Sequence, residues 1–127
     1  MHVVLTDMTG LNGPLTLTAS PETVSAGTVT FVVKNTGTID HSMIVVKTGT
    51  PFNRLPIVDG GSPPASVATG ANEVDESGKI GGTGAPDLKP GETRTFKIKN
   101  MATGKYVLLS NIAKQYGMGM RAAFTVR

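Results

Sequence analysis

The chain has 127 residues, the length of one domain that can bury about two-thirds of its unfolded surface. It contains no cysteine, which excludes a disulfide framework, and its lysines and arginines are spread out rather than gathered in the basic stripe of a nucleic-acid binder. Its formal net charge is +3, and no apolar run approaches the roughly 20 residues that a membrane-spanning helix needs. With 16 Gly, 8 Pro and many Thr and Val, the composition favours short strands joined by turns.

Strand-like sequence begins at Val3, and no signal peptide precedes it. We therefore expect a mature domain. Since no internal repeat or domain boundary is visible, residues 1–127 are expected to form a single unit.

The first half of the chain predicts three strands. Residues 3–7 are rich in apolar side chains, and residues 15–18 alternate Leu and Thr as a half-buried strand does. Residues 28–34 alternate so that Val29, Phe31 and Val33 share one face. The segment between the second and third of these strands is expected to be a connector.

Residues 41–46 predict a strand that is buried on both faces, because Met and aliphatic residues follow one another without alternation. Such a strand belongs inside a sandwich. Residues 92–99 alternate again, and this pattern points Phe96 and Ile98 inward.

Residues 49–91 are the least regular part of the sequence. Gly and Pro at residues 60–64 and Gly at residues 81–84 break any periodic pattern. A segment of this length is expected to wrap one side of the fold and to contain a short strand or a helical turn.

The most informative stretch runs from Tyr106 to Met120. It predicts a strand that ends at Ser110, a loop of nine residues, and a return strand over residues 120–126. Tyr106, Leu108 and Ser110 fall on one face of the first strand. Together, the segments predict an all-β Greek-key sandwich of about eight strands.

This stretch resembles the metal loop of the cupredoxins, the small blue-copper proteins. That loop reads Tyr-x-x-x-Cys, a few residues, His, a few more residues and Met, and it closes into a final strand. Tyr106, Gly119 and Met120 lie at matching spacings, with Ser110 at the cysteine position and Gln115 at the histidine position.

The upstream half is similar to the same family. Residues 27–37 followed by the sequence from His41 to Val46 resemble the strand, the turn and the first histidine ligand of cupredoxins. The resemblance implies a cupredoxin-like sandwich, descent from an exported copper-binding electron carrier, a redox protein as partner, and no enzymatic activity. The sequence itself names neither the partner nor an oligomeric state.

Two of the four copper ligands that the resemblance implies are replaced. A blue-copper centre depends on a soft thiolate, whereas the Ser110 hydroxyl is hard, and the Gln115 amide is a weak ligand in place of an imidazole. We therefore expect a type 1 site, at His41, Ser110, Gln115 and Met120, that is disabled or weakened, with copper bound weakly or not at all. Ser110 and His41 do not indicate a hydrolase, because the sequence has no nucleophile-elbow motif and no oxyanion-hole signature.

The remaining His and Met residues support a second hypothesis. His41 with Met43, and Met118 with Met120, form two short pairs whose imidazole and thioethers suit Cu(I). In this hypothesis the protein handles Cu(I). The simpler interpretation is that His41 is a hydrogen-bonded histidine at a loop edge and that the methionines fill the core. A third hypothesis is a metal-free interaction module on the same scaffold.

Two further groups carry weaker signals. His2 could chelate copper only if removal of Met1 exposed it as the amino-terminal residue. Glu73, Asp75 and Glu76 form an acidic group without the spacing of a calcium loop, and we expect a solvated loop there.

Overall fold

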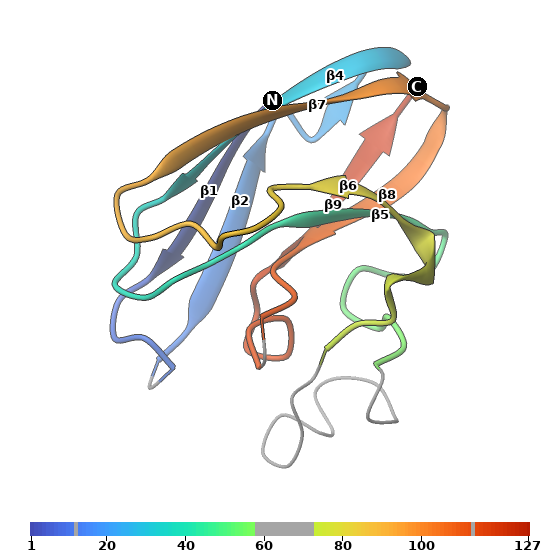
Figure 1. The fold of residues 1–127 in the computed structure, drawn as a ribbon. Coiled ribbons are helices and arrows are strands. Elements are labelled where there is room, and N and C mark those ends of the chain that lie inside the picture. Colours follow the sequence, from blue (N-terminus) through green and yellow to red (C-terminus); the bar gives the residue numbers. More distant parts are fainter. Residues whose placement is uncertain (12, 58–72, 113) are drawn as a thin grey trace.

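Two β-sheets pack against each other in the computed structural model, which describes residues 1–11, 13–57, 73–112 and 114–127 (Figure 1). The first sheet has four strands in the order β2-β1-β4-β7. Its strands are β1 (His2–Asp7), β2 (Leu15–Ser20), β4 (Gly27–Asn35) and β7 (Thr93–Met101).

The second sheet has five strands in the order β3-β9-β8-β5-β6. Its strands are β3 (Thr23–Val24), β5 (Ile44–Lys47), β6 (Lys79–Gly82), β8 (Gly104–Leu109) and β9 (Arg121–Val126). Both sheets are mixed: β1 pairs in parallel with β4, and β3 in parallel with β9. The described residues thus form nine strands, which confirms the expected all-β sandwich.

The main core lies between the two sheets and follows the alternation in the sequence. Val29, Phe31 and Val33 of β4 are all buried, as expected. The ring of Phe31 stacks on that of Phe96 in β7 with centroids 4.9 Å apart, so the inner face of β7 is also where the sequence predicts it.

The second sheet is covered on both faces. Ile44 and Val46 of β5 and Val107 and Leu109 of β8 point away from the main core. They pack in a separate cluster with four residues from outside the sheet, which are Leu55, Ile57, Val74 and Tyr116. This second layer explains why β5 has no polar face.

The structure differs from the sequence-based expectations at three places. Gly81 and Gly82, which were expected to break the pattern, form the end of β6 and pair with Val45 and Ile44. His41 precedes β5, which begins at Ile44, and its backbone instead forms an isolated bridge with Leu88. The expected connector after β2 contains the short strand β3, because Thr23 and Val24 pair with the end of β9.

The irregular segment contains the expected short elements. A 3-10 turn, η1 (Glu76–Gly78), leads directly into β6. Residues 60–64, where the sequence predicts a break, lie outside the described residues.

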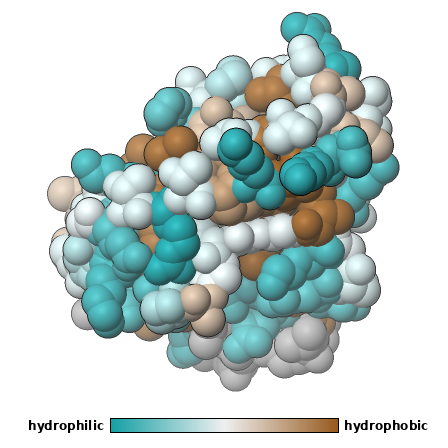
Figure 2. All heavy atoms as spheres, turned by 45° about the horizontal axis from the view of Figure 1, so that its top comes forward, coloured by the Kyte–Doolittle hydropathy of each residue, from teal (hydrophilic) through white to brown (hydrophobic). Residues whose placement is uncertain are grey.

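The surface mixes hydrophilic and hydrophobic side chains (Figure 2). The most exposed large apolar residues in the described part of the chain are Met8, Leu11, Phe52 and Ile80. No helix among the described residues is long and apolar enough to cross a membrane. The β1–β2 turn and the loop between β8 and β9 lie at the same end of the sandwich (Figure 1).

Candidate metal centre

His41 is fully buried, and each of its ring nitrogens has a polar neighbour. Nε2 lies 2.7 Å from Oδ1 of Asp7, and Nδ1 lies 2.8 Å from Oε1 of Gln115. The three residues come from the end of β1, the segment before β5 and the β8–β9 loop. The fold therefore brings together side chains that are 34 and 74 positions apart in sequence.

Asp7 accepts more hydrogen bonds than the one from His41. Its carboxylate accepts from the backbone N–H groups of Gly10 and Thr38, at 2.8 and 2.9 Å, and from the Thr38 hydroxyl. Burial alone would raise the pKa of Asp7, but the bonds from Thr38, Gly10 and His41 together hold that pKa well below its ordinary value. Asp7 is therefore a buried carboxylate that remains ionised.

The turn beside Asp7 requires a glycine. A Cβ atom at Gly37 would lie 2.1 Å from Oδ1 of Asp7 and 2.9 Å from Nε2 of His41. Asn35, at the end of β4, holds this turn by donating from Nδ2 to the carbonyls of Ile39 and Leu88, both at 2.9 Å.

Ser110 and Gln115 complete the buried network. The Ser110 hydroxyl donates to Oε1 of Gln115 at 2.7 Å, and it accepts from the backbone N–H of Ser42 at 3.3 Å. Nε2 of Gln115 donates to the carbonyl of Asp40 at 2.9 Å, which fixes the direction of the amide. Ser110, Gln115 and His41 thus lie together, as the resemblance to cupredoxins implies.

The two neighbours of the His41 ring are both acceptors. Asp7 presents a carboxylate oxygen to Nε2, and Gln115 presents its amide oxygen to Nδ1, because its amide nitrogen faces Asp40. Both ring nitrogens of His41 therefore lie within hydrogen-bond distance of an oxygen acceptor. In this network neither ring nitrogen of His41 is left without a polar neighbour, so a metal ion would have to displace one of them.

The arrangement also differs from that of a serine hydrolase. The Ser110 hydroxyl donates to Gln115 and not to the imidazole, so His41 is not placed to take its proton. Both Ser110 and His41 have no exposed surface. The Ser110 hydroxyl is therefore not accessible to a substrate as a nucleophile.

The methionines are core residues in this structure. Met43 and Met120 are fully buried in the main core, and Met118 packs against the same core while partly exposed. Met120 is held beside the network by its backbone, since its N–H donates to the carbonyl of Gln115 and its carbonyl accepts from the N–H of Ser110, both at 3.1 Å.

The donor set at the candidate centre does not fit a type 1 copper ion. A hydroxyl and an amide oxygen stand where a thiolate and a second imidazole are required, and the remaining imidazole is bonded to oxygen at both nitrogens. Within the described ranges, no group of three or more His, Cys, Asp or Glu side chains could hold a metal ion.

The other candidate residues do not join this centre. His2 is exposed at the start of β1. Asp75 caps η1 by accepting from the Ser77 N–H, and Glu76 pairs with Lys79 at 3.5 Å between half-exposed side chains. These contacts are those of a solvated turn, as expected.

Three polar residues with structural roles were not singled out by the sequence analysis. Asp7 follows Val3 and Leu5 at every second position of its strand, and Asn35 follows Val29, Phe31 and Val33 in the same way. This alternation of inward-facing positions could have placed both side chains inside the fold. Tyr116 lies in the β8–β9 loop. Its hydroxyl accepts from the Leu55 N–H at 3.0 Å and donates to the Phe52 carbonyl at 2.6 Å.

Comparisons with known proteins identify the class of fold. No protein-family model and no curated protein sequence matches the chain. Among solved structures, it is similar to a dithionite-reduced auracyanin from the photosynthetic bacterium Roseiflexus castenholzii. The two share 26% identity with a TM-score of 0.63, over 99% of this chain and 96% of the other.

Two further structures agree. Auracyanin A, a blue copper protein of Chloroflexus aurantiacus, is 22% identical with a TM-score of 0.62, over 100% of this chain and 98% of that one. Reduced rusticyanin is 20% identical with a TM-score of 0.54, over 100% of this chain and 79% of its own. The chain therefore has the cupredoxin fold, as its resemblance to that family implies.

Proposed function

We propose that this chain is a cupredoxin-like protein derived from a copper-binding electron carrier, and that its type 1 site is disabled. The fold and its similarity to auracyanins and rusticyanin support the first part. The hydrogen-bond network of Asp7, His41, Gln115 and Ser110, hereafter the buried polar network, supports the second. In this network the polar atoms of His41, Ser110 and Gln115 that would have to face a metal bond to one another instead.

The replacement of the ligands is coordinated, and this favours a settled metal-free centre over an accidental loss. A single change from cysteine to serine would leave a hydroxyl beside an imidazole. Here the second change supplies an amide whose oxygen accepts from both Ser110 and His41 and whose nitrogen finds a backbone acceptor. Buried polar groups are costly unless paired, and this set is paired throughout.

The proposal carries over three features of the family. The protein is exported, has a redox protein as its partner, and is not an enzyme. Residues 1–127 act as one domain.

A copper titration tests the proposal. Purified protein is titrated with Cu(II) by calorimetry and visible absorbance, and with Cu(I) in competition with a chromophoric chelator. We expect no intense visible band, because no thiolate is present, and weak or undetectable binding of either ion.

A tight stoichiometric Cu(I) complex would contradict the proposal and favour the second hypothesis, a Cu(I)-handling protein that uses His41, Met43, Met118 and Met120. The variant Met118→Leu with Met120→Leu is the matched test of that outcome, because Leu conserves volume but cannot bind copper. Cu(I) affinity that falls in this variant would assign the ion to the thioethers.

A further inference from the structure

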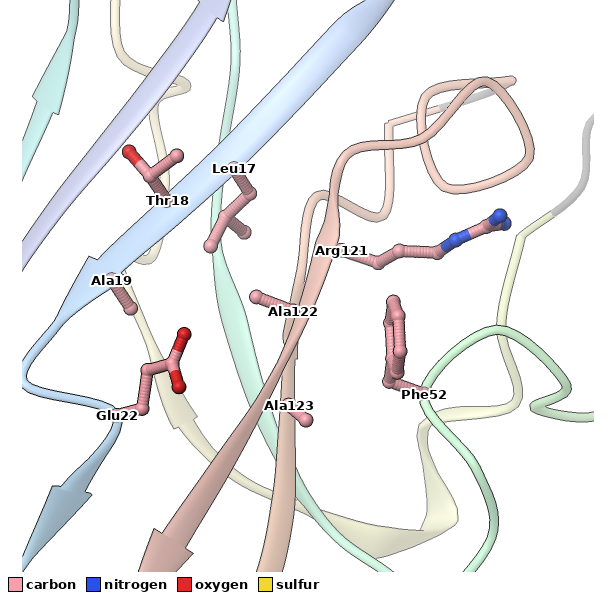
Figure 3. A pocket seen from close by; sticks show the side chains of 8 residues that line it. All are labelled: Leu17, Thr18, Ala19, Glu22, Phe52, Arg121, Ala122 and Ala123. Atoms are coloured by element: carbon pink, nitrogen blue, oxygen red, sulfur yellow. The ribbon is translucent and has the colours of Figure 1, made fainter.

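A groove of about 320 Å³ opens between β2 and β9 (Figure 3). These two strands belong to different sheets and form the walls of the groove. Leu17 and Ala19 lie on the β2 side, and Ala122 and Ala123 on the β9 side. The alanines, one on the β2 wall and two on the β9 wall, leave room for another segment of chain.

The β9 wall has an open backbone edge. β3 covers this edge only at Thr125 and Val126, and no described strand pairs with it between Arg121 and Phe124. The N–H of Thr125 donates across the edge to the Glu22 carbonyl at 2.9 Å. Because the direction of the backbone groups alternates with a period of two, the N–H and C=O of Ala123 point to the same open edge of β9 as those of Thr125.

The opposite wall is also a sheet edge, since β2 is the outermost strand of its sheet. The interior of the groove is apolar: Leu17 is buried, and Ala19 and Ala122 pack against the main core. Phe52 stands at the mouth with 39% of its surface exposed. An edge of unpaired backbone beside an apolar floor is the arrangement that binds an extended peptide.

Opposite charges mark the two ends of the groove. Arg121 lies at the start of β9, where its guanidinium sits 5.3 Å from the centroid of the Tyr116 ring and donates one N–H to the Tyr116 carbonyl. The exposed carboxylate of Glu22 lies beside the other end of β9. In Figure 3 the Glu22 side chain lies on the β2 side of β9, and the Arg121 side chain extends from the other side of the strand, next to Phe52.

We propose that this groove binds an extended segment of a partner protein as an added strand, parallel to β9 in continuation of β3. At about 3.3 Å per residue, roughly five residues span the open edge. Two apolar side chains of the segment point to Leu17 and Ala122. An acidic residue at its N-terminal end meets Arg121, and a basic residue at its C-terminal end meets Glu22. This surface is independent of the proposed loss of copper.

Two blocked pentapeptides of the same composition test the proposal. The first, acetyl-Glu-Val-Thr-Val-Lys-amide, matches the groove, and the second, acetyl-Lys-Val-Thr-Val-Glu-amide, reverses its charges. Each is titrated into the ¹⁵N-labelled protein, and affinity is read from backbone amide shifts. Two charge pairs near the surface predict about three- to tenfold tighter binding of the matching peptide, with the largest shifts at Ala122 and Ala123.

Two variants locate the contact. Ala123→Pro removes the N–H donor at an open edge, where proline is tolerated, and should weaken the matching peptide about fivefold while leaving the spectrum otherwise unchanged. If that variant does not fold, Glu22→Lys decides, since it alters an exposed side chain and should abolish the preference between the peptides.

Several results would overturn the proposal. They are no binding, equal binding of the two peptides, a preference for the reversed peptide, or full affinity in both variants. Concentration-dependent dimerisation that Ala123→Pro abolishes would show that a second copy of this chain occupies the groove instead.

Discussion

The Nε2 atom of His41 lies 2.7 Å from a carboxylate oxygen of Asp7, and neither side chain has any exposed surface. A carboxylate and an imidazole in this setting are expensive to desolvate, and their contact persists because each partner has further hydrogen bonds. Asp7 accepts from Gly10 and Thr38, and His41 bonds on its other side to Gln115.

Replacing Asp7 by Asn should destabilise the protein strongly. The change preserves shape but removes the charge that pairs with His41, and breaking a buried pair from one side costs about 3 kcal/mol or more. Urea denaturation measures the free energy of unfolding of each variant. The matched control is Asp87→Asn, an exposed carboxylate, which should change that free energy by less than about 0.5 kcal/mol. Equal effects of the two variants would show that the Asp7 pair does not stabilise the fold.

The stability that Asp7 confers should depend on pH in a defined direction. Its pKa is lowered in the folded state, so between that value and the ordinary carboxyl value of about 3.9 the unfolded chain binds more protons. The contribution is therefore fully present above the ordinary value and is lost as pH falls below it.

Unfolding free energies of the parent and of Asp7→Asn at pH 7 and at steps below pH 4 measure this linkage. The difference between the two proteins should shrink as the solution is acidified. A difference that stays constant or grows would mean that Asp7 is not ionised in the folded protein.

Tyr116 should be more important for stability than Tyr106, although both hydroxyls are hydrogen-bonded. Tyr116→Phe leaves the N–H of buried Leu55 without its acceptor and the Phe52 carbonyl without its donor, which predicts a loss of about 1–3 kcal/mol.

Tyr106→Phe is the matched comparison. It removes one donor from the carbonyl of exposed Ala102, which water can replace, so about 1 kcal/mol or less is expected. Thermal unfolding of both variants measures the difference, and a larger loss in Tyr106→Phe would contradict the role given to Tyr116.

The sequence predicts much of this fold because the strands alternate clearly. Val29, Phe31 and Val33 were assigned to one buried face, and the Tyr106 to Met120 stretch was divided into strand, loop and strand close to the observed bounds. His41 was expected within a strand. In the structure it precedes β5, since its backbone pairs with Leu88, a contact across 47 residues that no local pattern reveals.

The centre was predictable only in part. The spacing of Ser110 and Gln115, together with the resemblance, predicted that these side chains lie with His41. Asp7 was not foreseen as its partner, because an acidic residue before a turn is ordinarily solvated. Its role depends on the parallel pairing of β1 with β4, which places the end of β1 beside the turn after Asn35.

The most direct measurement is the visible spectrum of Ser110→Cys with Gln115→His after addition of Cu(II). Restoring the thiolate and the second imidazole removes the amide oxygen that occupies Nδ1 of His41, and with Met120 it completes the ligand set of a blue-copper site. Ser110→Cys alone is the control and should give at most a weak or altered band. We predict an intense charge-transfer band in the double variant and none in the parent. A double variant that folds, binds Cu(II) and stays colourless would contradict descent from a copper-binding carrier.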